Sequence, residues 1–133
     1  MIKKINHIGI AVRSLAASND LFSKLFEQFS PHRESVPQQN VNISFFPVGD
    51  STFELLETTA NDSSIAAFIE KRGEGIHHIC LEVVGLEDEI TRLKNHGFAF
   101  VNEEPTDGGD GFRVVFLHPR STNGVLIELC EKS

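Results

Sequence analysis

The chain contains an internal repeat, and this repeat constrains the fold more than any other feature. Residues 6–12 near the start return as residues 77–83, and residues 53–57 return as residues 126–130. Each copy therefore carries one histidine on its first predicted strand and one glutamate on its last. Two such copies packed about a pseudo-twofold axis can bring two histidines and two glutamates to one point. The repeat predicts two equivalent modules that share a metal site.

Length and charge narrow the classes of protein. With 133 residues, 40% of them hydrophobic and 23% charged, the sequence predicts one soluble globular domain over residues 1–133. The formal net charge is −7. An acidic chain without a basic stripe argues against nucleic acid and against an acidic membrane surface as partners.

The cellular compartment can be predicted from targeting segments and from the cysteines. No apolar stretch is long enough to span a bilayer, and the first predicted strand begins so close to Met1 that we expect no signal peptide. Cys80 and Cys130 fall in the middle of predicted strands, which favours reduced thiols over a disulfide framework. The sequence therefore predicts a cytoplasmic protein.

The first copy, about residues 1–72, reads as a βαβββ module. Alternating residues predict a strand over 5–12, with His7 on a face that is otherwise small-residued. Ser14 is the expected N-cap of a helix whose apolar residues recur up to Phe29, and Pro31 ends it. We expect a loop over 31–40, then strands over 41–48 and 52–57. Asp62 or Ser63 caps a short helix over 65–71 that stops at Gly73.

The second copy, about residues 76–133, repeats this order after a glycine hinge at 73–75. We expect a strand over 76–84, a helix over 86–96, and strands over 98–102, 112–118 and 124–131, with a glycine-rich loop over 107–111. The predicted fold class is α+β. Two βαβββ modules in tandem form a curved, eight-stranded pair of half-barrels around a metal cleft.

Four residues are the candidate metal ligands: His7, Glu54, His78 and Glu128. Imidazole nitrogens with carboxylate oxygens suit a divalent ion such as Co²⁺, Mn²⁺, Ni²⁺, Zn²⁺ or Fe²⁺. A single strand histidine or glutamate is usually an ordinary polar side chain. Here both types recur in two copies among apolar neighbours, where an unpaired carboxylate is costly. Four protein ligands also leave room for water or substrate, as catalytic sites require.

Other potential ligands have simpler explanations. His77 points to the opposite face from His78 by strand alternation, so His78 is preferred. Cys80 shares the face of His78 and could compete as a soft ligand, although a small buried residue in the wall is the simpler interpretation. We expect His118 to form a local hydrogen bond at a strand end. His32, His96 and Arg92 are expected on the surface.

At this point the sequence resembles a known family. The paired βαβββ order is similar to the vicinal oxygen chelate superfamily of glyoxalases, bleomycin resistance proteins and dioxygenases. Within it, several strings resemble the methylmalonyl-CoA epimerases. These strings cover residues 7–12, 47–57, 68–79, 116–122 and 124–129. The match extends over nearly the whole chain and is weakest over residues 20–40.

The resemblance implies a function. It implies a divalent metal, Co²⁺ first and otherwise Mn²⁺, Ni²⁺ or Zn²⁺, held by His7, Glu54, His78 and Glu128. It implies an epimerase that interconverts (2R)- and (2S)-methylmalonyl-CoA in propionate metabolism, with an acyl-CoA substrate and a homodimer. A metal stabilises the oxyanion that forms when the proton next to a thioester is removed, and Glu128 can serve as acid or base on one face.

The sequence departs from the family at one point that matters for mechanism. Some epimerases carry a second glutamate on the strand predicted over 41–48, at the position aligned with Ile43. A symmetric mechanism with two such glutamates is therefore in doubt here. The cations that could contact coenzyme A are Lys71, Arg72, Arg113 and Arg120, each of which is equally well explained as a solvated surface charge.

Two alternatives remain open. One is a glyoxalase I-like lactoylglutathione lyase, which uses the same four-ligand logic and also moves a proton next to a carbonyl. Extradiol dioxygenases, by contrast, use three ligands, and the fourth candidate Glu54 disfavours them. The other alternative is a metal-free binding protein of the same fold, in which a retained set of two histidines and two glutamates is hard to explain.

Overall fold

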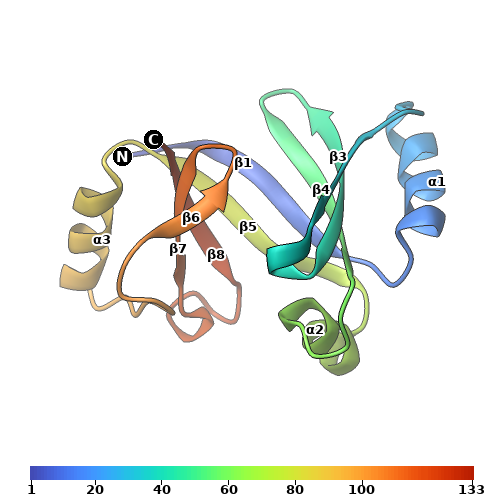
Figure 1. The fold of residues 1–133 in the computed structure, drawn as a ribbon. Coiled ribbons are helices and arrows are strands. Elements are labelled where there is room, and N and C mark those ends of the chain that lie inside the picture. Colours follow the sequence, from blue (N-terminus) through green and yellow to red (C-terminus); the bar gives the residue numbers. More distant parts are fainter. The chain divides into compact units, whose positions relative to one another are not determined.

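The computed structural model describes residues 1–133 as two compact units (Figure 1). The N-terminal unit comprises Ile8–His77, and the C-terminal unit comprises Met1–His7 with His78–Ser133. The hydrogen-bonded strand order is β2-β3-β4-β1-β5-β8-β7-β6. The helices and strands are β1 (Ile2–Ala11), α1 (Leu15–Phe26), β2 (His32–Val36), β3 (Val41–Val48), β4 (Ser51–Thr58), α2 (Ser64–Arg72), β5 (Gly75–Val83), α3 (Leu86–Asn95), β6 (Thr106–Gly109), β7 (Phe112–Leu117) and β8 (Ile127–Lys132). The predicted α+β class, with a βαβββ order in each half, is confirmed.

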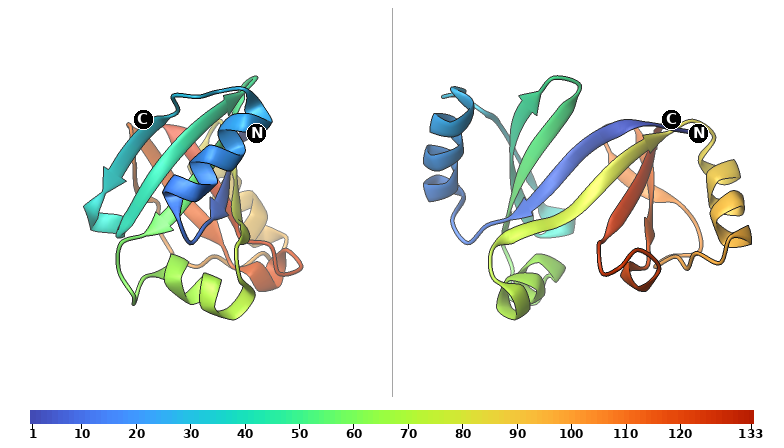
Figure 2. Two further views of the ribbon diagram at one scale, coloured as in Figure 1. Left: turned by 90° about the vertical axis from the view of Figure 1, so that its right-hand side faces the viewer. Right: turned by 180° about the vertical axis from the view of Figure 1, so that it is seen from behind.

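The N-terminal unit is an antiparallel sheet with a helix on each face (Figure 2). Strands β2, β3 and β4 pair in sequence, with Ile43 opposite Leu56. One face packs under α1 through the fully buried Phe46 and Leu55. The other face packs under α2, where Ile43 and Leu56 meet Ile65. Strand alternation thus divides the sheet into two separate apolar layers.

Helix α1 begins as predicted but ends earlier than predicted. The Ser14 side chain accepts a hydrogen bond from the Ala17 N–H at 3.2 Å, which confirms the N-cap. The helix ends at Phe26 because Glu27 adopts a left-handed conformation (φ 55°), so the predicted extension to Phe29 is wrong. Only part of the expected apolar face is buried: Leu21, Leu25 and Phe29 are 63%, 67% and 72% exposed.

The segment over 31–40 was expected to be a loop, and this expectation is wrong. Residues His32–Val36 form strand β2, and Pro37–Gln39 form a single turn of 3₁₀ helix. The strand has little apolar content but pairs with β3 along its whole length, from His32 opposite Phe45 to Val36 opposite Val41. Backbone pairing at a sheet edge therefore decides its structure.

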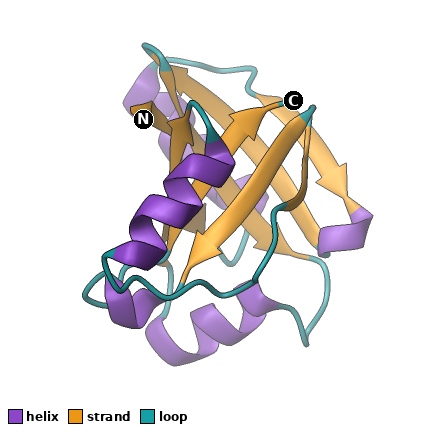
Figure 3. Cartoon of the chain, turned by 90° about the vertical axis from the view of Figure 1, so that its left-hand side faces the viewer, coloured by secondary structure: helices purple, strands orange, loops and turns teal.

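The C-terminal unit has the same layered construction, with α3 lying across its strands (Figure 3). Strand β8 is parallel to β5 and antiparallel to β7, which in turn pairs with β6. The core forms where Leu86, Ile90 and Leu93 of α3 pack on this sheet. Leu86 is fully buried. The predicted spacing of this helix is confirmed, although its last residue is Asn95 and His96 is the C-cap.

The second strand of the second module lies in a different place from the prediction. Residues 98–102 form no strand and contribute one isolated bridge, Phe100 to Leu117. The strand β6 forms instead within the predicted glycine-rich loop. A Cβ at Gly108 would clash with the side chain of Val114 on β7, and Gly109 has a φ of +86° at a bulge. The glycines therefore permit close strand pairing here.

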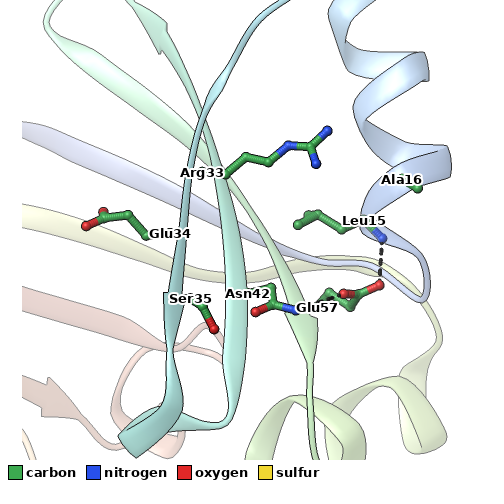
Figure 4. Close-up of a pocket in the computed structure, with 7 residues that line it drawn as sticks. All are labelled: Leu15, Ala16, Arg33, Glu34, Ser35, Asn42 and Glu57. Atoms are coloured by element: carbon green, nitrogen blue, oxygen red, sulfur yellow. Dashed lines mark hydrogen bonds between the residues drawn. The ribbon is translucent and has the colours of Figure 1, made fainter.

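A carboxylate caps the first helix of each half, in a way that the sequence did not predict. Glu57 at the end of β4 accepts a hydrogen bond from the Leu15 N–H at 2.9 Å (Figure 4). Glu131 on β8 accepts from the N–H groups of Gly85 and Leu86 at 2.6 and 3.1 Å. Negative charge at a helix N-terminus stabilises the helix through its unpaired N–H groups and its dipole.

Two further findings concern the chain as a whole. Cys80 and Cys130 are free and buried, as predicted. None of the helices has the length and apolar content needed to cross a membrane.

Candidate metal centre

The parallel pairing of β5 and β8 builds the centre of the site. Cys80 on β5 lies directly opposite Glu128 on β8. His78 precedes Cys80 by two residues and therefore projects from the same face of β5. His7 comes from β1, in the part of that strand that belongs to the same unit. The C-terminal unit thus supplies three of the four predicted ligands by itself.

These three side chains converge on one point. The Nε2 atoms of His7 and His78 lie 3.0 Å apart, and each lies 3.4 Å from Oε1 of Glu128. The two imidazole rings are perpendicular, with centroids 5.1 Å apart. Two ring nitrogens and one carboxylate oxygen therefore face one another, as ligands around a common cation do.

The neighbour of His7 sets which nitrogen of that ring is available. Asn6 Nδ2 donates to Oε1 of Glu82 at 3.0 Å, so its Oδ1 is directed at His7 Nδ1, 2.8 Å away. Because an amide oxygen only accepts, Nδ1 carries the proton and Nε2 presents its lone pair. Metal-binding histidines are commonly oriented in this way by a second hydrogen bond. Neither Asn6 nor Glu82 is predicted from the sequence as part of the site, and the only signal for Asn6 is that it precedes His7.

Burial and charge determine the state of Glu128. Glu128 and His78 are each 8% exposed. Burial alone raises the pKa of the Glu128 carboxyl, but the hydrogen bond with His7 and the charges of His78 and His7 outweigh burial and leave its pKa below the usual value. Glu128 is therefore a carboxylate at neutral pH, held in a buried site that favours a positive charge beside it.

The side chain of Cys80 lies beside two of the predicted ligands, His7 and Glu128. Its sulfur, a ring nitrogen of His7 and a carboxylate oxygen of Glu128 all lie within 4.8 Å of one another. The thiol is fully buried. Hydrogen bonding with Cys130 and burial raise its pKa far above the usual value, which favours the neutral thiol. Cys80 is therefore a neighbour of the three predicted ligands, and a thiol that resists ionisation is a poor ligand.

The remaining histidines occupy the places that the sequence predicted. The ring of His77 contacts Phe68 edge-on, with centroids 5.1 Å apart. His118 Nδ1 accepts a hydrogen bond from the Arg120 N–H at 3.1 Å, which confirms its local role at a strand end. His32 and His96 are exposed, as expected.

The fourth predicted ligand belongs to the other unit. Glu54 lies on β4 of the N-terminal unit, opposite Phe45, and is partly exposed. Its membership of the ligand set stays a prediction. The three residues of the C-terminal unit nevertheless fit a divalent metal by the chemistry of their donor atoms, since two imidazoles and a carboxylate suit Co²⁺, Mn²⁺, Ni²⁺ or Zn²⁺.

The cations considered for coenzyme A differ in their surroundings. Arg113 forms an ion pair with Glu87 on α3. The Arg72 guanidinium lies over the ring of Phe68, 5.7 Å from its centroid. Arg120 is exposed and lines a cavity of about 390 Å³ that also includes His96 and Phe98. Contact of these residues with a ligand stays a prediction.

Comparisons with known proteins agree with the fold. Residues 6–116 match the Glyoxalase/Bleomycin resistance protein/Dioxygenase superfamily. The ethylmalonyl-CoA/methylmalonyl-CoA epimerase of Cereibacter sphaeroides is 36% identical, over 97% of this chain and 98% of the relative. The uncharacterized protein YqjC of Bacillus subtilis is 35% identical, over 98% of this chain and 93% of the relative.

A solved structure is similar over the whole chain. It is a serine-to-threonine variant of the Streptomyces coelicolor methylmalonyl-CoA epimerase, in complex with 2-nitronate-propionyl-CoA. The TM-score is 0.87 with 30% identity, and the match covers 100% of this chain and 96% of the other. The present chain belongs to the glyoxalase/bleomycin resistance/dioxygenase superfamily. Within that superfamily it groups with the methylmalonyl-CoA epimerases, and it is an enzyme of the racemase and epimerase class.

Proposed function

We propose that this protein is a metal-dependent methylmalonyl-CoA epimerase that interconverts the (2R) and (2S) forms of its substrate. The observation that carries the proposal is the convergence of His7, His78 and Glu128 at 3.0–3.4 Å in a chain of this family. Relatives named for ethylmalonyl-CoA and methylmalonyl-CoA support an acyl-CoA substrate. The reaction requires removal of a proton from C2, next to the thioester, and its return on the other face.

His7, His78 and Glu128 would hold the metal, with Glu54 as the predicted fourth ligand. Co²⁺ is the first expectation, and Mn²⁺, Ni²⁺ and Zn²⁺ also suit these donors. When bound, such an ion stabilises negative charge on the thioester oxygen as a Lewis acid. Asn6 fixes the ring of His7 by the 2.8 Å hydrogen bond at Nδ1, so the Nε2 lone pair is oriented before the ion binds.

Glu128 is the proposed acid and base on one face of C2. Its pKa is lowered by the neighbouring imidazoles, which keeps it ionised and able to accept a proton. Its burial keeps water from competing for that proton, since only 8% of the residue is exposed. A positioned acid or base contributes roughly 10²–10⁴-fold to such a reaction.

The direct test is hydrogen exchange at C2 of methylmalonyl-CoA in D₂O, followed by NMR. Exchange that a chelator stops and added Co²⁺ restores supports the epimerase and its metal together. Glu128→Gln should lower the exchange rate by about 10²-fold or more. If the metal-loaded protein catalyses no exchange, the proposal is wrong, and the glutathione–methylglyoxal adduct then tests the lactoylglutathione lyase alternative.

The assembly and the compartment are part of the same proposal. A homodimer is expected, and the exposure of the apolar residues Leu21, Leu25 and Phe29 supports a partner on the surface near α1. Light scattering of the purified protein measures the mass directly. We expect the enzyme to act in propionate metabolism in the cytoplasm. The free thiols Cys80 and Cys130 are consistent with this compartment.

A further inference from the structure

The side-chain amide of Asn6 has two possible orientations, and only one of them suits the proposed function, on which the present inference rests. In the observed orientation, Oδ1 of Asn6 lies 2.8 Å from Nδ1 of His7. A half-turn of the amide would exchange its oxygen and nitrogen and direct an N–H donor at that ring nitrogen. His7 alone does not select between the two, because a nitrogen of a neutral imidazole can donate or accept. The selection must therefore come from the other side of the amide.

Glu82 lies on that other side. Asn6 Nδ2 donates a hydrogen bond to Oε1 of Glu82 at 3.0 Å. A carboxylate accepts hydrogen bonds and has none to donate, so Glu82 requires the amide nitrogen to face it. The amide oxygen then faces His7. The ammonium group of Lys3 lies 3.8 Å from Oε2 of Glu82, so the second carboxylate oxygen faces a positive charge.

Two neighbouring strands hold these groups in place. Asn6 and His7 are consecutive residues of β1, and Glu82 is on β5, which is next to β1 in the hydrogen-bonded order. His78 precedes Glu82 by four residues and lies on the same face of β5. All four residues belong to the C-terminal unit. The side chain of Glu82 is only 16% exposed, so water competes little for its hydrogen bond with Asn6.

The orientation of the amide matters because the ring of His7 could otherwise rotate. A half-turn of this ring would move Nε2 away from Nε2 of His78 and Oε1 of Glu128, which lie 3.0 and 3.4 Å from it. A side chain that is already ordered loses less conformational entropy when it binds an ion. The outer hydrogen-bond partners of metal-binding histidines contribute roughly 10–100-fold to metal affinity for this reason among others.

We propose that Glu82 is a positioning residue of the metal site and acts on His7 through the amide of Asn6. Glu82 fixes the orientation of the amide, and the amide fixes the rotation of the imidazole. The imidazole then presents Nε2 toward His78 and Glu128 before the ion binds. Glu82 needs no contact with the metal or the substrate for this role.

The first test compares Glu82→Ala, Asn6→Ala and the double variant with the wild type, by calorimetric titration of the metal-free proteins with Co²⁺. Each single variant should bind Co²⁺ about ten-fold more weakly, or worse. Because Glu82 acts through Asn6, the double variant should bind no more weakly than Asn6→Ala does. Glu82→Gln keeps an oxygen that can accept from Asn6 and should recover part of the loss.

The second test follows His7 without any metal. The ring proton that His7 Nδ1 donates to Asn6 should give a slowly exchanging N–H signal in the proton NMR spectrum of the metal-free wild type, assigned by its loss in His7→Ala. The signal should be absent in Asn6→Ala and should exchange faster with water in Glu82→Ala. A purely structural role of Glu82 would lower the urea midpoint and leave this signal unchanged.

Glu103→Ala is the matched control. It removes another carboxylate of the same unit, paired with Lys94 at 3.4 Å, and should leave the affinity for Co²⁺ unchanged. If Glu82→Ala binds Co²⁺ as the wild type does, or weakens binding equally with and without Asn6, Glu82 does not act through Asn6. If the wild type binds no Co²⁺, it is the metal-dependent function that fails, and the N–H signal still tests the link from Glu82 to His7.

Discussion

The Nε2 atom of His7 lies 3.0 Å from the Nε2 atom of His78, although the two residues are 71 positions apart in the chain. Asn6 holds the proton of His7 on the other ring nitrogen, so a lone pair points toward His78. Two nitrogens at this distance need a proton or a cation between them, and Glu128 adds a negative charge 3.4 Å from each. These donor atoms suit a divalent metal, which is the cation proposed here.

The first prediction concerns the two adjacent histidines of β5. His78→Ala removes a predicted ligand and should weaken binding of Co²⁺ by at least about 100-fold, because loss of an outer hydrogen-bond partner alone costs 10–100-fold. His77→Ala is the matched control, since that ring contacts Phe68 instead. Calorimetric titration of metal-free protein measures both affinities. Equal affinities in the two variants would mean that His78 is not a ligand.

The second prediction concerns removal of the metal. A ligand that binds only the folded state adds about 2.7 kcal/mol to the free energy of unfolding when its concentration is 100 times its Kd. Added Co²⁺ should therefore raise the urea midpoint of chelator-treated wild type, and the gain should shrink at acid pH because the ligands must lose protons. The gain should be absent in His7→Ala. A similar gain in this variant would indicate binding elsewhere.

The sequence alone allowed most of the fold to be predicted, and the errors have a common cause. The three helices are present, although α1 ends at Phe26, and the strands rich in apolar residues form where their periodicity predicts, except that residues 98–102 form only an isolated bridge. The two missed strands are β2 and β6, which stand at the two ends of the hydrogen-bonded order. One is polar and the other is TDGG in sequence. Such edge strands form because their backbone hydrogen-bonds to the adjacent strand. A single sequence does not show this pairing.

The part of the site that could be predicted is the part that occurs in both copies of the internal repeat. His7, His78 and Glu128 stand out because each has a counterpart in the other copy, and the structure brings these three together. The position of Cys80 opposite Glu128 depends on the register of β5 against β8. The hydrogen bond from His7 to Asn6 depends on side-chain rotation. The residue types of a single sequence determine neither the register of these strands nor the rotation of these side chains, so neither could be predicted.

The third prediction concerns the carboxylates that cap α1 and α3. Glu131→Ala leaves the N–H groups of Gly85 and Leu86 without their partner and should lower the free energy of unfolding by about 1–2 kcal/mol. Glu57→Ala should cost less, about 1 kcal/mol, because Glu57 accepts from one helix N–H only. Glu70→Ala, at an exposed position of α2, is the control. Urea unfolding gives the three values, and no loss in Glu131→Ala relative to this control would contradict the capping role.

The fourth prediction concerns the pH dependence of stability. Glu89 on α3 is 4% exposed, and its Oε2 accepts a hydrogen bond from Arg92 Nε at 2.7 Å. This bond, chiefly, lowers the pKa of Glu89 in the folded state. A carboxyl whose folded pKa lies below its unfolded value, about 4.3 for glutamate, stabilises the fold above that pH and loses its contribution as pH falls through the folded pKa.

Glu89→Gln should therefore lower the free energy of unfolding by about 1 kcal/mol at pH 7, since a charge-assisted hydrogen bond is roughly twice as strong as a neutral one. The difference from wild type should decrease as pH falls below about 4, because Glu89 then becomes protonated in both states. Glu87→Gln on the same helix is the matched control, since its ion pair with Arg113 is exposed and should contribute much less. Urea midpoints of the three proteins across this pH range measure the effect. A difference between Glu89→Gln and wild type that stays constant with pH would show that packing, and not charge, is what the substitution changes.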